Sequence, residues 1–124
     1  MKDPINLQTA SDKLQELWSP RVIGQLDDAY YVKIAKLEGD LAWHSHDNED
    51  ELFLVIEGNL KIEMKDRTVN LGPGDMYVVP KGVMHNPIAE GVCSVLVFEK
   101  KETRHMGEIE NERTHSIEDQ LRPL

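Results

Sequence analysis

The chain has 124 residues, 40% of them hydrophobic, and a net charge of −9 from 14 basic and 23 acidic side chains. This length suits one domain with a single core. A strongly negative chain repels the phosphate backbone of nucleic acids and the surface of anionic membranes. We therefore expect a soluble protein that has neither of these as a partner.

The cellular compartment is predicted from the apolar runs and from cysteine usage. The longest apolar runs, 52–56 and 95–98, fall far below the roughly 20 residues of a membrane-spanning helix. The N-terminal segment lacks the apolar core of a secretory signal, so we expect a cytoplasmic protein. Cys93 is the only cysteine, and its apolar neighbours predict a small buried residue rather than a nucleophile.

The secondary structure is predicted to be one short helix followed by strands. A helix is expected over 11–18, where large apolar side chains recur at helical spacing, namely Leu14, Leu17 and Trp18. Short segments separated by turn signals then predict strands over 22–26, 30–37, 41–46, 52–57, 60–65, 68–71, 76–79 and 92–100. This pattern is typical of an all-β antiparallel sandwich or barrel. The charged tail is compatible with a helical turn over 116–121 or with a frayed end.

Three histidines and one glutamate form the clearest candidate site. His44 and His46 lie two residues apart, so in an extended strand both imidazoles would project from the same face. Glu51 follows in the chain, and His85 ends the segment 80–85, Pro-Lys-Gly-Val-Met-His. Imidazole and carboxylate ligands suit zinc, iron, nickel, copper or manganese. The alternative is a barrel that uses these histidines for polar contacts without a metal.

Strand alternation separates Glu51 from the acidic run 47–50 that precedes it. A run of charges is usually a solvated loop, but Glu51 opens an apolar strand. Alternation puts Glu51 on the same face as Phe53 and Val55, and it puts Leu52, Leu54 and Ile56 on the opposite face. The same rule turns Trp43 away from the histidines, where we expect core packing in preference to a subunit contact.

Two glycine-containing motifs carry these candidate ligands. The first consists of Gly39, His44, His46, Glu51 and Gly58, and the second of Gly74, Pro80, Gly82 and His85. Over residues 39–89 this pattern resembles the cupin superfamily, except that Gly39 is one residue closer to the first histidine and Ala89 replaces an asparagine. The resemblance implies a double-stranded β-helix, or jelly-roll barrel, with His44, His46, Glu51 and His85 as the metal ligands.

The chain also resembles the small single-domain cupins described as similar to mannose-6-phosphate isomerase. In these, a conserved tail follows the last strand, and Glu99, Thr103 and Gly107 echo it, with His105 in the usual asparagine position. The resemblance implies one cupin domain over 1–124, with a core at about 21–100, an N-terminal helical segment at 9–19 and a C-terminal tail at 101–124. It also implies a homodimer, for which the surface formed by Leu14, Leu17 and Trp18 is the expected contact.

The fold leaves the reaction open, because cupin barrels include isomerases, oxygenases, lyases and binding modules. We expect a metalloenzyme that uses a divalent transition metal (Zn, Fe, Mn or Ni) on a small polar metabolite such as a sugar or an organic acid. The alternative is a non-catalytic cupin domain that binds or senses a small molecule. No catalytic residue is assigned, and the candidates for an acid or base are Tyr30, Tyr31, Tyr77 and His105.

Overall fold

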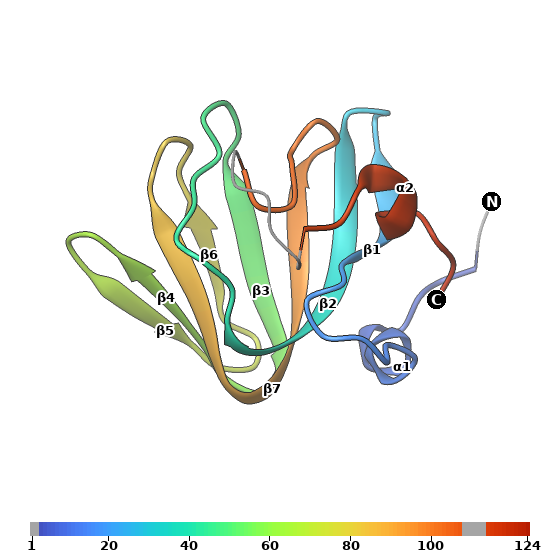
Figure 1. Cartoon of the computed structure of the whole chain (residues 1–124). Helices are drawn as coiled ribbons and strands as arrows, with labels where there is room; N and C mark the ends of the chain where they lie inside the picture. The colour runs from blue at the N-terminus through green and yellow to red at the C-terminus, as the bar shows by residue number, and fades with distance from the viewer. Residues whose placement is uncertain (1–2, 108–113) are drawn as a thin grey trace.

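The fold is an antiparallel sheet curled into a barrel-like shape, as Figure 1 shows. The computed structural model describes residues 3–107 and 114–124. The strands are β1 (Arg21–Leu26), β2 (Tyr30–Asp40), β3 (Glu51–Glu57), β4 (Leu60–Met64), β5 (Thr68–Leu71), β6 (Met76–Val79) and β7 (His85–Lys100). The helices are α1 (Leu7–Asp12) and α2 (Ile117–Gln120). The prediction of an all-β fold with a short N-terminal helix is confirmed.

β7 is the strand that connects the two parts of the barrel. Its first residues, 85–89, pair with β4, and two of them also pair with the end of β2. Its last residues, 93–100, pair with β2 on one side and β3 on the other. The predicted strand covers only 92–100, whereas β7 begins at His85. Pro87 lacks a backbone N–H to donate, but its carbonyl oxygen accepts a hydrogen bond from Leu41 N at 3.3 Å, so it remains within the sheet. The longer strand places His85 at its first position.

The predicted strand over 41–46 does not form as a regular strand. A single antiparallel bridge joins His44 to His85, with backbone N–H···O distances of 2.9 and 2.8 Å, and Gly82 N donates to His46 O at 2.9 Å. These bonds are enough to keep the segment extended beside the start of β7. The alternation of side chains therefore survives, since His44 and His46 are buried and Trp43 is exposed. The expectation that Trp43 packs in the core is wrong.

The predicted helix over 11–18 is displaced towards the N-terminus. Asn6 caps α1, its side chain accepting a hydrogen bond from Thr9 N at 2.9 Å, and the helix ends at Asp12. The chain then runs along β2, where Trp18 N donates to Lys36 O at 2.8 Å. Trp18 has a positive φ of 57° and inserts its ring into the barrel, where its Nε1–H donates to Glu38 O. Burial of Trp18 outweighs the helical pattern of the sequence.

This displacement also changes the surface that we expected to pair with a second subunit. Leu14 is 5% exposed and Trp18 is 4% exposed, because both pack against the chain's own barrel. Leu17 alone of the three remains exposed. The predicted contact surface of Leu14, Leu17 and Trp18 is therefore wrong.

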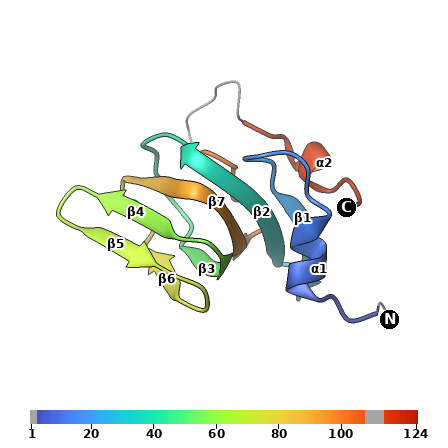
Figure 2. The same cartoon turned by 90° about the horizontal axis from the view of Figure 1, so that it is seen from below.

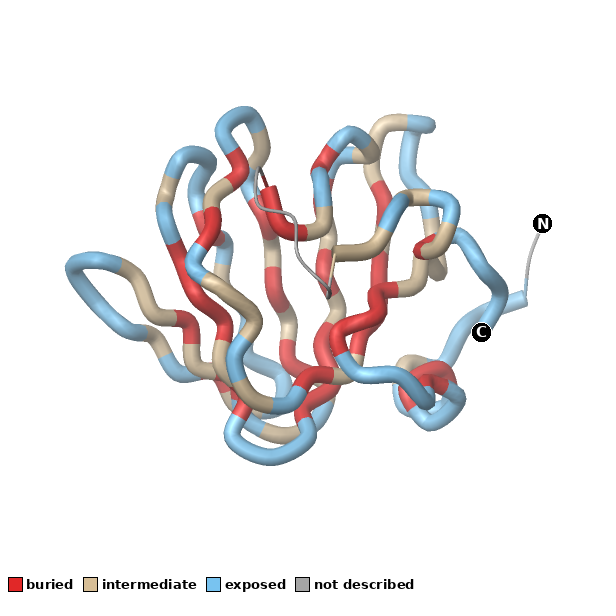
Figure 3. The backbone as a smooth tube through the Cα atoms, viewed as in Figure 1, coloured by how far each residue is buried: buried red, intermediate tan, exposed pale blue. Residues whose placement is uncertain are grey.

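Side chains along the strands alternate between the interior and the outer surface of the barrel, as the red and paler bands of Figure 3 show. On β3, Glu51, Phe53 and Val55 are buried, whereas the residues between them are partly exposed, which confirms the predicted alternation. Cys93 is buried and free, as predicted. The interior thus combines an apolar core with a few charged side chains.

The C-terminal segment returns to the barrel after β7. Thr103 and Met106 are buried, and Ser116 caps α2, its Oγ accepting a hydrogen bond from Asp119 N. Of the alternatives that the sequence left open for 116–121, the structure thus has the helical turn. Figures 1 and 2 place α1 and α2 on the same side of the barrel, near β1 and β2. Residues 108–113 of the predicted tail lie outside the described residues. Within the described chain, neither helix has the length and apolarity needed to span a bilayer.

Candidate metal centre

The candidate ligands identified in the sequence lie together inside the barrel. His44, His46, Glu51 and His85 each offer one ligand atom, and these atoms all lie within 4.8 Å of one another. The four residues are between 0 and 6% exposed. Nitrogen and oxygen donors gathered at this spacing can hold a divalent transition metal. We refer to these four residues as the metal cluster.

Each member of the cluster comes from a position that the fold fixes. His44 and His46 belong to the extended segment after β2, Glu51 opens β3, and His85 opens β7. The backbone bridge between His44 and His85 sets these two imidazoles next to each other, with ring centroids 4.3 Å apart. Residues distant in the chain thus share one site because their strands are neighbours in the sheet.

Backbone carbonyl groups orient two of the three imidazoles. His44 Nδ1 lies 2.9 Å from Ala42 O, and His85 Nδ1 lies 3.0 Å from Val83 O. A carbonyl oxygen only accepts, so each Nδ1 carries a proton and donates it. The lone pair of each ring is then on Nε2. Metal-binding histidines in proteins are commonly held in this way.

Several polar atoms of the cluster lack a hydrogen-bond partner within the described chain. They are His46 Nδ1 and Nε2, Glu51 Oε1 and His85 Nε2. Glu51 Oε1 lies 3.4 Å from His46 Nε2 and 3.5 Å from His85 Nε2, which is too long for a good hydrogen bond. Buried polar atoms without partners are rare and costly. A cation among them would satisfy them, so the residues fit a metal ion.

The imidazoles differ in their affinity for protons. Burial, together with the charge of His85, lowers the pKa of His44 to about 4. Burial also opposes the charged form of His46, but the carboxylate of Glu51 outweighs it and raises the pKa of His46. Since a metal binds the unprotonated ring, His44 is available at neutral pH, whereas His46 must release a proton more often.

Two further charged residues extend the cluster to one side. Burial, together with the charge of Glu51, raises the pKa of Glu99 well above its usual range, although the ammonium group of Lys33 opposes this rise. Burial alone would raise the pKa of Glu51, but contacts with His46, His85 and Glu99 lower it well below its usual range. Glu99 also forms an ion pair with Lys33, whose Nζ lies 2.7 Å from Glu99 Oε1.

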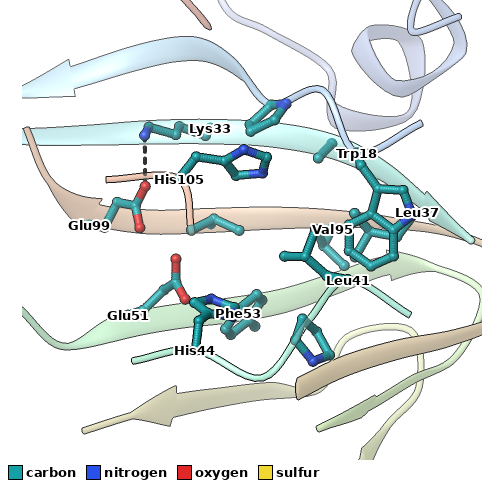
Figure 4. A pocket seen from close by; sticks show the side chains of 14 residues that line it. Trp18, Lys33, Leu37, Leu41, His44, Glu51, Phe53, Val95, Glu99 and His105 are labelled. Carbon is teal, nitrogen blue, oxygen red and sulfur yellow. Dashed lines mark ion pairs between the residues drawn. The ribbon is translucent and has the colours of Figure 1, made fainter. Parts of the chain in front are cut away.

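A pocket inside the barrel opens onto the metal cluster. His44 and Glu51 line it together with Lys33, Glu99 and His105, and Figure 4 shows Trp18, Leu37 and Phe53 among its apolar walls. The space available to the centres of water-sized molecules is about 50 Å³. A water needs roughly 10–15 Å³ on this measure, so the pocket holds only a few waters or a ligand of similar size.

Only one of the predicted acid or base candidates lines this pocket. It is His105, whose Nδ1 accepts a hydrogen bond from His115 N at 3.1 Å. Burial lowers the pKa of His105 to about 4, so the ring is neutral at pH 7 and carries its proton on Nε2. Tyr30, Tyr31 and Tyr77 are not among the lining residues.

The sequence analysis missed Lys33 and Trp18 as pocket residues. Alternation could have found Lys33, because it falls on the same face of β2 as Ala35 and Leu37, where a charge is unexpected. No local signal places Trp18 in the pocket, since its position depends on the path of the chain along β2.

Comparisons with known proteins agree with this geometry. A structure of a cupin-2 domain containing protein from Shewanella frigidimarina is 41% identical, with a TM-score of 0.76, and covers 78% of this chain and 94% of that one. The uncharacterized protein YdbB of Bacillus subtilis is 36% identical over 64% of this chain and 71% of its own length. The 3-hydroxyanthranilate 3,4-dioxygenase of Xenopus tropicalis is 25% identical over 82% of this chain, which spans only 38% of that enzyme.

The family is shown by a match that covers more than half of the chain. The family described as "Cupin domain" matches residues 30–99, which run from the start of β2 to the end of the last strand and contain the complete metal cluster. The barrel, the buried histidines and glutamate, and this match lead to one conclusion: the chain belongs to the cupin family.

Proposed function

We propose that this cupin binds a divalent transition metal (zinc, iron, manganese or nickel) through His44, His46, Glu51 and His85 and acts as a metalloenzyme on a small polar metabolite, a sugar or an organic acid. The observation that carries the proposal is the set of buried cluster atoms without hydrogen-bond partners, next to a pocket. A bound cation would satisfy those atoms, because their nitrogen and oxygen lone pairs are metal ligands.

The residues around the cluster support chemistry at a bound metal. The metal would supply Lewis acidity, polarising a carbonyl or hydroxyl group, or would bind dioxygen. The apolar walls, including Phe53 and Val95, exclude bulk water and so strengthen electrostatic interactions inside the pocket. His105 adds a neutral N–H donor at the pocket wall.

Elemental analysis of protein purified without chelator tests this proposal. About one equivalent of metal per chain is expected in the wild type, and the double variant His44→Ala/His85→Ala should lose it, because each change removes a ligand and costs on the order of tenfold or more in affinity. Iron would favour oxygenase chemistry, whereas zinc, manganese or nickel would favour isomerase or lyase chemistry or plain binding. Full metal content in the double variant would contradict the assigned ligands.

The second candidate is a non-catalytic domain that binds or senses a small molecule. The buried Ala89, at a position where the cupin pattern has asparagine, favours it, because alanine offers no polar group. The pocket also has only one imidazole outside the cluster among its described lining residues. The two candidates differ in turnover: a sensor would bind its ligand at the metal and return it unchanged.

The remaining expectations are proposals about the whole chain. We propose a single cupin domain over 1–124, a cytoplasmic location, and a relationship to the small cupins similar to mannose-6-phosphate isomerase.

We also propose a homodimer that forms through the outer face of β3 and β6. There Met76 and Val78 are 53% and 40% exposed, and an apolar face of this kind favours pairing.

A further inference from the structure

Lys33 is a charged side chain enclosed in the barrel interior. It is 1% exposed, and its Nζ lies 2.7 Å from Glu99 Oε1 and 5.9 Å from the centre of the Tyr31 ring. Its ammonium group has three N–H donors, and apart from the ion pair with Glu99 its Nζ has no hydrogen-bond partner within the described chain. Burying such a group costs free energy unless its donors find acceptors. Lys33 therefore has donor capacity that the described protein groups do not use.

The unused donors of Lys33 belong to the pocket that contains the metal cluster. Lys33 lines the same pocket as His44 and Glu51, and Figure 4 shows Lys33, Glu99 and Glu51 in a row, with His105 beside Lys33. The Nδ1 of His105 accepts from a backbone N–H, so the neutral ring offers a second donor at Nε2. One side of the pocket thus supplies hydrogen-bond donors and the other supplies metal-binding atoms.

The charges in this pocket favour an anionic ligand once a metal is bound. Even with Glu51 and Glu99 both ionised, their two negative charges and the positive charge of Lys33 sum to −1. A divalent cation in the cluster would change this sum to +1. In an apolar pocket an uncompensated charge is costly, and a ligand with one negative charge would neutralise it.

The size of the pocket restricts the ligand further. Its space of about 50 Å³ for water-sized molecules suits a short molecule, and its remaining walls, which include Trp18 and Phe53, are largely apolar. A ligand that reaches both sides of the pocket therefore needs an anionic group at one end and a neutral oxygen at the other.

We propose that Lys33, with His105 as a second donor, is the anion-binding residue of this pocket, and that its ligand is a short organic acid. The carboxylate contacts Lys33, and a hydroxyl or carbonyl oxygen of the same molecule faces the metal cluster. This inference rests on the proposed metal-dependent function, and it selects an organic acid in preference to an uncharged sugar.

Calorimetric titration of two probes tests the inference. Glycerate and glycerol differ in one carboxylate, and each is titrated into zinc-loaded and into chelator-treated protein. The wild type should prefer glycerate by about tenfold or more, because hydrogen bonds to charged groups are the strong ones. The variant Lys33→Met/Glu99→Gln removes both charges at similar volume and should lose this preference. Lys61→Met, at the exposed lysine paired with Glu90, is the matched control and should keep it.

Several outcomes would overturn the inference. One is a folded double variant that keeps the wild-type preference for glycerate, which would make the Lys33–Glu99 pair purely structural. Another is a wild type that binds neither probe. If the double variant does not fold, isotope-labelled lysine in the wild type decides, since the Nζ signal of Lys33 must shift with glycerate and not with glycerol.

The zinc content separates this inference from the proposed function. A wild type that binds none of zinc, iron, manganese and nickel would refute the metal proposal, while a Lys33-dependent preference for glycerate in the chelator-treated protein would still support the anion site. Stoichiometric zinc without any preference for glycerate would refute the anion site alone.

Discussion

At the scale of single residues, the identity of the proposed carboxylate ligand depends on one position of register. Glu51 is buried with its Oε1 near two imidazoles, whereas the neighbouring Asp50 accepts a hydrogen bond from Lys81 N at 2.8 Å. Asp50 therefore binds the backbone of Lys81, inside the second motif, and does not face the cluster. The alternation read from the sequence placed Glu51 on the inner face correctly, because its strand is regular from its first residue.

The variant Glu51→Gln should bind a divalent metal about tenfold or more weakly than the wild type, because it removes the anionic ligand of the cluster at constant size. Asp50→Asn is the matched control and should bind normally, since its amide oxygen can still accept from Lys81 N. Metal titrations of both variants measure the difference. If Asp50→Asn lost the metal and Glu51→Gln kept it, the carboxylate that faces the cluster would be Asp50 and not Glu51.

A second residue-scale prediction concerns His105 in the chelator-treated protein. Its pKa is about 4 when folded and near 6.5 when unfolded, so the unfolded chain binds more protons between these values and the folded state loses stability as pH falls. His105→Asn removes this titration. Between pH 7 and pH 4.5 the wild type should lose about 2 kcal/mol more than His105→Asn. Urea unfolding at both pH values measures this, and equal losses would contradict the burial of a neutral His105.

At the scale of elements, the segment that follows β7 packs on the segment that carries the histidines. Gly107 has a φ of +60°, and a Cβ there would lie 1.9 Å from Ser45 O, between His44 and His46 in the chain. Met106 beside it is fully buried. This close approach explains how a charged tail with few large apolar residues still docks on the barrel.

The variant Gly107→Ala should be destabilised by about 2 kcal/mol more than Gly74→Ala, because both residues have a positive φ but only Gly107 meets another backbone. Chemical unfolding measures the free energy of unfolding of both variants. Because both share the strain of a positive φ, the difference between them reports the contact of residue 107 with Ser45 O. If both variants lose the same stability, the tail does not depend on its contact with Ser45.

At the scale of the whole molecule, one outer face of the barrel remains apolar. Leu52 pairs with Val78 and Phe98, and Leu54 pairs with Met76, so their partly exposed side chains form a continuous patch on β3, β6 and β7. Ala10 of α1 packs against Ile34 of β2. Met76 and Val78 of the patch remain exposed. A second copy of the chain is the occupant that we propose for it.

Sedimentation should show a dimer for the wild type at micromolar concentration and a monomer for Met76→Lys/Val78→Lys, because charges buried at such an interface lack partners. Val92→Lys changes an exposed residue at the bend of β7 and should leave the dimer intact. A wild type that sediments only as a monomer would contradict the proposed pairing.

The sequence by itself determined the fold class, the inner face of β3 and the residues of the metal cluster, because these depend on local alternation and on motif spacing. The paths of Trp18 and of the first half of β7 were decided only by the tertiary structure. Burial of an indole ring outweighed helical periodicity, and pairing with β4 kept Pro87 in a strand. The proximity of Lys33, Glu99 and Glu51 was also decided by the tertiary structure. An ion pair between two strands cannot be predicted from the sequence until the register of β2 and β7 is known.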